Sequence, residues 1–216
     1  LDMIKPVTKV APVAAADLTA DRVAAQKRRS YAEKTVGKVA TDEHTFDQFV
    51  AAIPSEKQRV EQVCAASAQV ARTLASIHRL GLAHRDIKPA NIHVKVHLVE
   101  TDLEVVVLDF GTHHFGHSAE DTGALRGTPA YMAPEQRLGM PHDHRVDIHS
   151  LGTVLHEAIS GQRASSVPPG QRRPSLVGRG PHIPLALAHL VDRMLDLDPS
   201  ERPSAEEAEA VLQGIA

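Results

Sequence analysis

A polar stretch near the middle of the chain limits the folds that this sequence can adopt. It reads His-Arg-Asp-Ile-Lys-Pro-Ala-Asn and spans residues 84–91. Proline has no backbone N–H and disfavours helical backbone at the residue before it, so Pro89 argues against a helix through the stretch. We therefore expect a loop that gathers a possible base (Asp86), a cation suited to phosphate (Lys88) and an oxygen ligand suited to a hard metal ion (Asn91).

Three further motifs follow the loop in order. Asp109-Phe110-Gly111 comes directly after an apolar run, residues 127–135 read Gly-Thr-Pro-Ala-Tyr-Met-Ala-Pro-Glu, and residues 198–204 read Asp-Pro-Ser-Glu-Arg-Pro-Ser. A polar turn with chance charges could account for one of these motifs, but not for their common order and spacing. The series H-R-D-x-K-x-x-N, D-F-G, A-P-E and D-P-x-x-R-P-S resembles the catalytic core of the protein kinases.

This resemblance implies a role for each polar residue of the loop. Asp86 would orient the acceptor hydroxyl and receive its proton, and Lys88 would offset charge on the moving phosphoryl group. Asn91 and Asp109 would hold Mg²⁺ against the phosphates of ATP. The catalytic residues implied are thus Asp86, Lys88 and Asn91. The residues that would bind the cofactor are Lys88, Asn91 and Asp109. Of these, Asn91 and Asp109 would be the metal ligands. Phe110 would pack so as to fix the orientation of Asp109.

The resemblance also implies contacts that support the loop. Asp147 would accept hydrogen bonds from backbone N–H groups of the loop and hold His84 and Arg85 in place, and a carboxylate at a helix N-terminus is favourable in any case. Glu135 would form a buried ion pair with Arg202.

The segment before the A-P-E motif implies substrate choice and regulation. Thr128 would lie near Lys88 and Asp86 and mark serine/threonine specificity. Thr112, Ser118 and Thr122 are candidate phosphorylation sites, and the Arg85 guanidinium could receive such a phosphate. An ordinary polar loop residue remains the alternative for each hydroxyl.

Helical periodicity and capping residues place helices on both sides of the loop. Thr45 and Ser55 each open a capping box, the first helix ends at Pro54, and the second covers residues 56–80 with Gly81 after it. Cys64 falls on the apolar face of that long helix, where a buried small hydrophobe is the expected role rather than a nucleophile.

The rest of the chain continues this pattern. Residues 92–96 and 103–108 are rich in β-branched side chains and predict two short strands. A helix opening at Asp147 is apolar nearly all round and belongs in a core. Residues 162–184 predict an extended loop, within which Arg172-Arg173-Pro174-Ser175 is interpreted as a solvated linker rather than a docking or phosphorylation site. Amphipathic helices follow at 187–195 and 205–215.

The N-terminal region lacks the matching pattern. The chain contains no G-x-G-x-x-G sequence. Lys5 weakly resembles the lysine with which the family binds the ATP phosphates, and Glu33 weakly resembles the glutamate that pairs with it. A solvated charge is the better interpretation for each. We therefore expect an α+β, protein-kinase-like fold. Residues 45–216 would form the mainly helical C-terminal lobe with a short β-hairpin beside the catalytic loop, and residues 1–44 an incomplete or degenerate N-terminal lobe.

Composition excludes several other classes of protein. A net charge of −3 provides no basic surface for nucleic acid, and no run of about 18 apolar residues predicts a membrane span. The single cysteine excludes an internal disulfide and, with no signal-peptide pattern, favours a cytoplasmic protein. Histidines gather at 113, 114 and 117 and at 142 and 144, where a metal site is conceivable but polar loops are the simpler explanation.

Two functions stay open. The first is a serine/threonine protein kinase that uses ATP and Mg²⁺ and phosphorylates a protein substrate, favoured by the intact Asp86, Lys88, Asn91 and Asp109. The second is a non-catalytic, kinase-derived domain that binds or regulates partners, favoured by the missing glycine-rich loop. Without cover for the phosphates, residues 1–216 alone are expected to bind Mg·ATP weakly and to transfer phosphate slowly or not at all.

Overall fold

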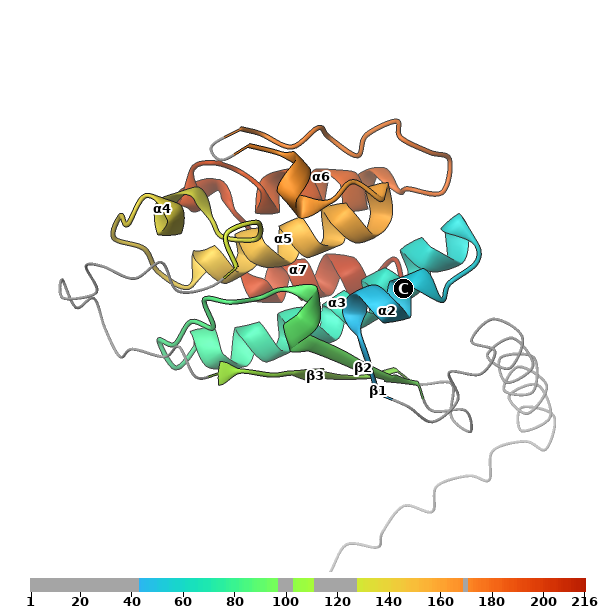
Figure 1. Ribbon diagram of the computed structural model, residues 1–216, viewed down its shortest axis with the longest axis horizontal. Helices are drawn as coiled ribbons and strands as arrows, with labels where there is room; N and C mark the ends of the chain where they lie inside the picture. Colours follow the sequence, from blue (N-terminus) through green and yellow to red (C-terminus); the bar gives the residue numbers. More distant parts are fainter. Residues whose placement is uncertain (1–42, 97–102, 111–127, 169–170) are drawn as a thin grey trace, which may run out of the picture.

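The computed structural model describes residues 43–96, 103–110, 128–168 and 171–216, and Figure 1 shows their arrangement. A small antiparallel sheet lies along one side of a bundle of helices. In chain order the elements are β1 (Glu43–Thr45), α2 (Phe46–Ala51), α3 (Glu56–His78), η1 (Pro89–Asn91), β2 (Ile92–Val96), β3 (Leu103–Val107), α4 (Pro134–Arg137), α5 (Arg145–Ser160), η3 (Ala164–Ser166), α6 (Leu185–Met194), η4 (Pro199–Glu201) and α7 (Ala205–Gln213).

Helix α3 is the long helix predicted before the loop, and it forms the scaffold of the described part. The Ser55 hydroxyl accepts a hydrogen bond from the Gln58 N–H at 3.3 Å, which confirms the predicted N-cap. Gly81 has the left-handed backbone expected after a helix, with φ of 74°. One face of α3 packs against β3 and others against α5 and α7. Cys64 is fully buried there, and burial raises its pKa to about 12, as expected for a structural thiol.

The predicted hairpin is present, but it is part of a larger sheet. Strands β2 and β3 pair antiparallel with Ile92 opposite Val107, and β1 adds a third strand with Thr45 opposite His93. The local sequence does not predict β1. Its three residues are too few to show an alternating pattern, and they become a strand because the free edge of β2 supplies backbone partners.

Helix α5 runs through the core, as its apolar sequence predicts. It begins at Arg145, two residues before Asp147, and ends at Ser160, and Gly161 follows as a left-handed C-cap with φ of 69°. Helix α6 packs directly on α5. The approach is so close that a Cβ at Gly152 would lie 2.7 Å from the Met194 Cβ.

The segment between α5 and α6 is an extended loop with one 3₁₀ turn, but it is not a solvated linker throughout. Arg172 is exposed, whereas Arg173 is half-buried and donates from Nη2 to the Ala164 carbonyl at 2.9 Å. Leu176 is fully buried in the core. The linker interpretation is therefore wrong for Arg173, because its guanidinium satisfies a loop carbonyl that would otherwise lack a partner.

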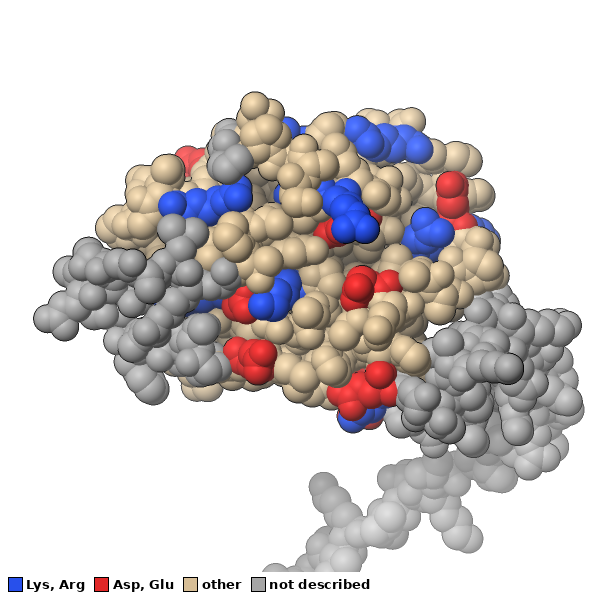
Figure 2. Space-filling view, viewed as in Figure 1, with Lys and Arg blue, Asp and Glu red and all other residues tan. Residues whose placement is uncertain are grey.

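Several predictions lie outside the described residues: Lys5, Glu33, the three candidate phosphorylation sites and the histidines at 113, 114 and 117. Among the described residues, none of the helices has the length and apolar character needed to cross a membrane. On the face shown in Figure 2, acidic and basic side chains are interspersed.

Candidate active site

Residues 84–91 form the predicted loop, and α5 anchors it. Asp147 is completely buried and accepts hydrogen bonds from the His84 N–H at 2.8 Å and the Arg85 N–H at 2.7 Å. The expected contact between this carboxylate and the loop backbone is thus confirmed. His78, from the end of α3, also hydrogen-bonds to Asp147, with 2.9 Å between Nε2 and Oδ2.

The Asp86 carboxylate receives three hydrogen bonds. Its Oδ1 accepts from the Thr128 backbone N–H at 3.0 Å, while its Oδ2 accepts from Lys88 Nζ at 2.7 Å and Asn91 Nδ2 at 3.1 Å. The structure therefore brings together the three loop residues that the sequence singled out. Thr128 lies beside Asp86 as predicted, and the contact is made by its backbone N–H.

The end of β3 carries Asp109 to the same loop. The Leu108 N–H donates to the Asn91 carbonyl at 2.8 Å, and the Leu108 carbonyl hydrogen-bonds to His84 Nε2, also at 2.8 Å. Asp109 follows directly and is exposed. Phe110 packs its ring against the edge of the His84 ring, with 4.9 Å between centroids, so the residue after Asp109 is fixed to the loop.

Two residues at this junction have unusual backbone. Arg85 has φ of 68° and Asp109 has φ of 61°, in the left-handed region that non-glycine residues seldom occupy. Such conformations persist only where surrounding contacts impose them, and they concentrate at functional sites. For Arg85 those contacts include the Asp147 carboxylate on its N–H and the Gln136 side-chain amide, which donates to its carbonyl at 3.2 Å.

The side chains near this junction suit Mg²⁺. Asn91 is buried, and its Nδ2 donates to Asp86 twice, at the carbonyl and at the carboxylate, so Oδ1 is the atom left for a metal ion. Asp109 supplies a carboxylate that forms no hydrogen bond or ion pair within the described residues. Amide and carboxylate oxygens are ligands that Mg²⁺ prefers, with phosphate oxygens and water completing its shell.

The histidines that the structure describes form no comparable site. Within the described residues, no three His, Cys, Asp or Glu side chains are grouped so that they could hold a metal ion. His142 instead hydrogen-bonds to the Met140 carbonyl at 2.8 Å, and the His144 ring packs on the His78 ring with centroids 4.6 Å apart.

Comparison with known proteins decides the family. Residues 40–211 match the protein kinase domain family. The chain belongs to this family. It is 36% identical over 170 residues to the serine/threonine-protein kinase pkn3 of Myxococcus xanthus, covering 68% of this chain and 30% of the relative. It is 34% identical over 169 residues to PkaA of Streptomyces coelicolor, covering 69% of this chain and 28% of the relative.

A solved structure agrees with these relatives. The fold of this kinase chain is similar to that of a double mutant of the PknI kinase domain from Mycobacterium tuberculosis, with a TM-score of 0.60 and 25% identity. The match covers 81% of this chain and 63% of the solved domain. The chain thus spans about 30% of the length of the two relatives and less than two thirds of the solved domain.

The ion pair predicted within the kinase lobe is present. Arg202 donates from Nη1 to Glu135 Oε1 at 2.6 Å and from Nη2 to Oε2 at 3.0 Å, and both side chains are buried. The guanidinium also donates to the carbonyls of Asp196 and Arg145. Arg202 therefore connects the A-P-E segment to the start of α5 and to the turn before α7.

Sequence reasoning missed other residues that hold the kinase loop. His78 supports Asp147 from α3, and Gln136 supports Arg85 from α4. Tyr131 donates its hydroxyl to Glu157 on α5 at 2.7 Å, which ties down the segment that follows Thr128. The sequence signal for these residues is weak, since each is a polar residue beside a motif and its partner lies far along the chain.

Proposed function

We propose that this kinase transfers the γ-phosphoryl group of ATP to a serine or threonine hydroxyl of a protein substrate. The observation that supports this most is the Asp86 carboxylate, which Thr128, Lys88 and Asn91 hold in one orientation. Phosphoryl transfer depends on positioning and charge neutralisation more than on covalent chemistry, so a preoriented carboxylate beside a cation suits it.

In this proposal Asp86 and Lys88 act on the two ends of the reacting bond. The substrate hydroxyl oxygen forms a bond to the γ-phosphorus while the bond to the ADP oxygen breaks, and the hydroxyl proton passes to Asp86. Lys88 lies 2.7 Å from Asp86 and remains partly exposed, so its ammonium can turn to the transferring phosphoryl group and offset its charge.

Asn91 and Asp109 would hold the metal ion of Mg·ATP through the Asn91 amide oxygen and the Asp109 carboxylate. When bound, Mg²⁺ neutralises charge on the nucleotide phosphates. The hydrogen bond from Leu108 to the Asn91 carbonyl keeps the two segments in register. Thr128, beside Asp86, would favour serine and threonine acceptors, and the relatives are named serine/threonine kinases. We further propose a cytoplasmic location, because the proposed reaction uses ATP and the one cysteine of the chain is unpaired.

The direct test is transfer of radiolabel from ATP to protein. The chain is incubated with Mg·[γ-³²P]ATP and either an acidic or a basic test protein, and the labelled residues are identified after acid hydrolysis. Phosphoserine or phosphothreonine in either protein supports the proposal. Phosphotyrosine alone, or no label in a chain shown to bind Mg·ATP, contradicts it.

A second candidate function is a kinase-like domain that binds partners without catalysis. One observation favours it: the sequence contains no G-x-G-x-x-G run to cover the ATP phosphates. Water that reaches the phosphates weakens both positioning and electrostatic stabilisation, so residues 1–216 alone should bind Mg·ATP weakly. Calorimetric titration decides this point, because micromolar binding with steady turnover would show that the sequence supplies the missing cover in another form.

A further inference from the structure

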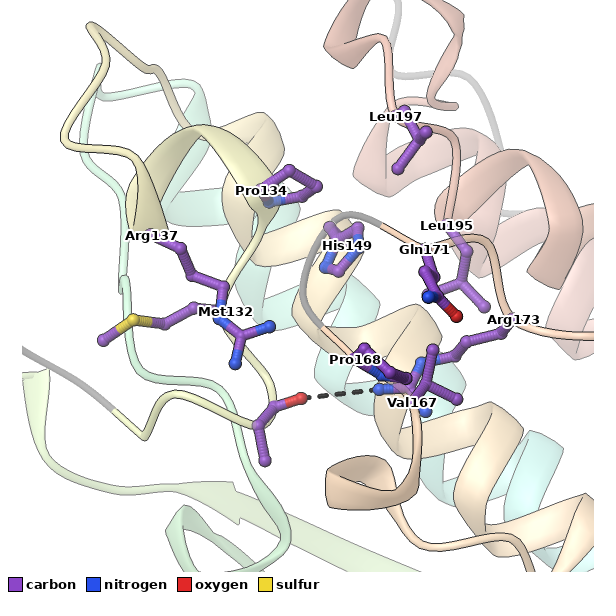
Figure 3. Close-up of a pocket in the computed structure, with 11 residues that line it drawn as sticks. Met132, Pro134, Arg137, His149, Val167, Pro168, Gln171, Arg173, Leu195 and Leu197 are labelled. Carbon is purple, nitrogen blue, oxygen red and sulfur yellow. Dashed lines mark hydrogen bonds between the residues drawn. The ribbon is translucent and has the colours of Figure 1, made fainter.

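A pocket lies beside the segment that follows Thr128. Its walls come from Ala130 and Met132 in that segment, from α4, from α5 and from the loop between α5 and α6 (Figure 3). The pocket is small and open to solvent, with a cavity volume of about 30 Å³. That is enough room for the few atoms at the end of a polar side chain, and too little for a nucleotide.

Two arginines, Arg137 and Arg173, line this pocket together with the imidazole of His149. Arg137, from α4, and Arg173, from the loop, approach from opposite sides in Figure 3, with His149 on α5 behind them. Acidic side chains are absent from the described residues that line it. The described walls of the pocket therefore have two guanidinium charges and no carboxylate.

Several hydrogen-bonding groups of these basic residues are unused. His149 is 9% exposed, and its Nδ1 is buried without a hydrogen-bond partner among the described residues. Arg173 donates from Nη2 to the carbonyls of Ala164 and Ala130, at 2.9 and 3.4 Å, but in the same described part of the chain its Nη1 is buried without a partner. The Arg137 guanidinium forms no hydrogen bond or ion pair within the described residues. A buried polar group without a partner destabilises the protein, so these groups are better explained as ligand contacts than as core packing.

The electrostatics of the pocket point to a ligand of negative charge. Burial and the nearby Arg137 lower the pKa of Arg173, while Glu157 and Tyr131 raise it. The Glu157 carboxylate is engaged by the Tyr131 hydroxyl at 2.7 Å and makes no ion pair with Arg173 in the described part of the chain. Two guanidinium groups that repel each other across a hollow would both be stabilised by an anion between them.

We infer that this pocket binds the carboxylate of an acidic residue in the protein substrate. The wall that contains Ala130 and Met132 continues directly from Thr128, whose amide contacts Asp86, so a substrate chain at the catalytic loop passes close to the pocket mouth. Arginine in a confined site suits a carboxylate, because its planar fork donates two parallel hydrogen bonds. This inference rests on the proposed function, since it names the class of substrate for the same site.

Peptide binding measured without ATP tests the inference separately from catalysis. Labelled peptides carry one serine in an otherwise uncharged sequence, with a single Glu placed in turn at each flanking position, and each has a matched Gln peptide. Fluorescence anisotropy with the full 216-residue chain gives the dissociation constants. We expect the Glu peptide to bind about tenfold more tightly than its Gln partner at one position, the scale of one desolvated charge-assisted hydrogen bond.

Two substitutions locate the preference. Arg137→Gln should abolish the difference between the Glu and Gln peptides, because Arg137 has no structural partner to lose. Arg172→Gln is the matched control: it removes the same charge from an exposed residue outside the pocket that pairs with Asp196 at 3.0 Å, and it should keep the difference. If the Arg137→Gln variant has a lowered melting temperature, the Arg173→Lys variant is measured in its place. Lysine retains the positive charge but lacks the forked guanidinium that donates two parallel hydrogen bonds.

Distinct outcomes overturn the inference or the proposed function. Equal binding of Glu and Gln peptides at every position, or equal loss of the preference in Arg172→Gln, overturns the acidic-substrate pocket. Competition by inorganic phosphate at constant ionic strength, combined with no preference between the peptides, would assign the pocket to free anions and also overturn it. A clear preference in a chain that binds Mg·ATP but transfers no phosphate would leave the pocket standing and remove the kinase proposal.

Discussion

At the scale of single residues, the catalytic loop depends on two carboxylates that each take part in several hydrogen bonds. Asp86 and Asp147 each receive three hydrogen bonds, the first from Thr128, Lys88 and Asn91 and the second from His78 and the loop backbone. A carboxylate with several donors is held in one orientation, and any substitution is felt by all of its partners. The two residues differ in exposure, so their substitution should have different effects.

Asp86→Asn should remove phosphoryl transfer and leave the fold intact. The amide has the shape of the carboxylate and can still meet Thr128, but it cannot accept the proton of the substrate hydroxyl. We expect transfer to fall at least about 100-fold, the usual scale for a lost general base. Radiolabel transfer and a thermal melt of both proteins measure the two effects. A variant with parental activity would exclude Asp86 from this role.

Arg202→Ala should destabilise the kinase lobe strongly. It leaves the Glu135 carboxylate buried without its partner, and breaking a buried pair in this way costs about 3–5 kcal/mol. In a chain of this size that corresponds to a fall of roughly 10 °C in melting temperature. Arg193→Ala is the control, because Arg193 pairs with Glu207 at the exposed surface, where an ion pair contributes about 1 kcal/mol or less. Equal melting temperatures for the two variants would refute the importance of the buried pair.

At the scale of elements, α5 positions both the catalytic loop and the proposed pocket. Its first turn holds Asp147 under the loop, and His149, two residues further along the helix, lines the pocket. The position of α5 is set in part by close packing on α6, where Gly152 meets Met194. Packing between the two helices should therefore affect stability at a distance from the site.

Gly152→Ala should destabilise the protein although alanine is the better helix former. Its Cβ would lie 2.7 Å from the Met194 Cβ, which requires α5 and α6 to separate. Overpacking of this kind costs about 1–3 kcal/mol. Gly214→Ala is the matched control, since its Cβ would come no closer than 3.6 Å to the Val211 carbonyl oxygen, and its stability should stay near that of the parent or rise slightly. Chemical denaturation of the three proteins gives the difference, and a stabilised Gly152→Ala would contradict the packing argument.

At the scale of the whole molecule, buried histidines make the fold sensitive to mild acid. Burial, with Arg202 and Arg173 nearby, lowers the pKa of His149 to about 3. Burial also lowers the pKa values of His156 and His144. Between pH 6.5 and 3 the unfolded chain therefore binds more protons at these residues than the folded chain, so the free energy of unfolding decreases as the pH falls through this range.

Melting temperatures at pH 7 and pH 5 test this. His149 alone should remove about 2 kcal/mol of stability between these pH values, given an unfolded pKa near 6.5 and 1.36 kcal/mol per pKa unit. Above pH 5 the change in stability comes mainly from histidine. The carboxyl pKa values of Asp198 and Glu206 are lowered from ordinary values near 4, so these groups affect stability only at lower pH. His149→Gln should flatten the pH dependence, whereas His182→Gln, at an exposed site, should leave it unchanged. A parent protein equally stable at both pH values would contradict the argument.

Much of this protein follows from its sequence alone. Local patterns determine the loop at Pro89, the caps at Ser55 and Gly161, the buried faces of α3 and α5, and the β2–β3 hairpin, because each depends on neighbours within a few residues. The order of the motifs was enough to indicate the family and to predict the contacts of Asp147 and Arg202.

Only the tertiary structure determined the rest. Strand β1 exists because the edge of β2 lies beside it, and the left-handed backbone of Arg85 and Asp109 is imposed by contacts from α5, α4 and the loop. The proposed pocket forms only after α4, α5 and the loop pack together, because its residues Arg137, His149 and Arg173 are separated along the chain. Local pattern cannot encode such sites, because they depend on contacts between residues separated by many positions in the chain, and those contacts form only when the core does.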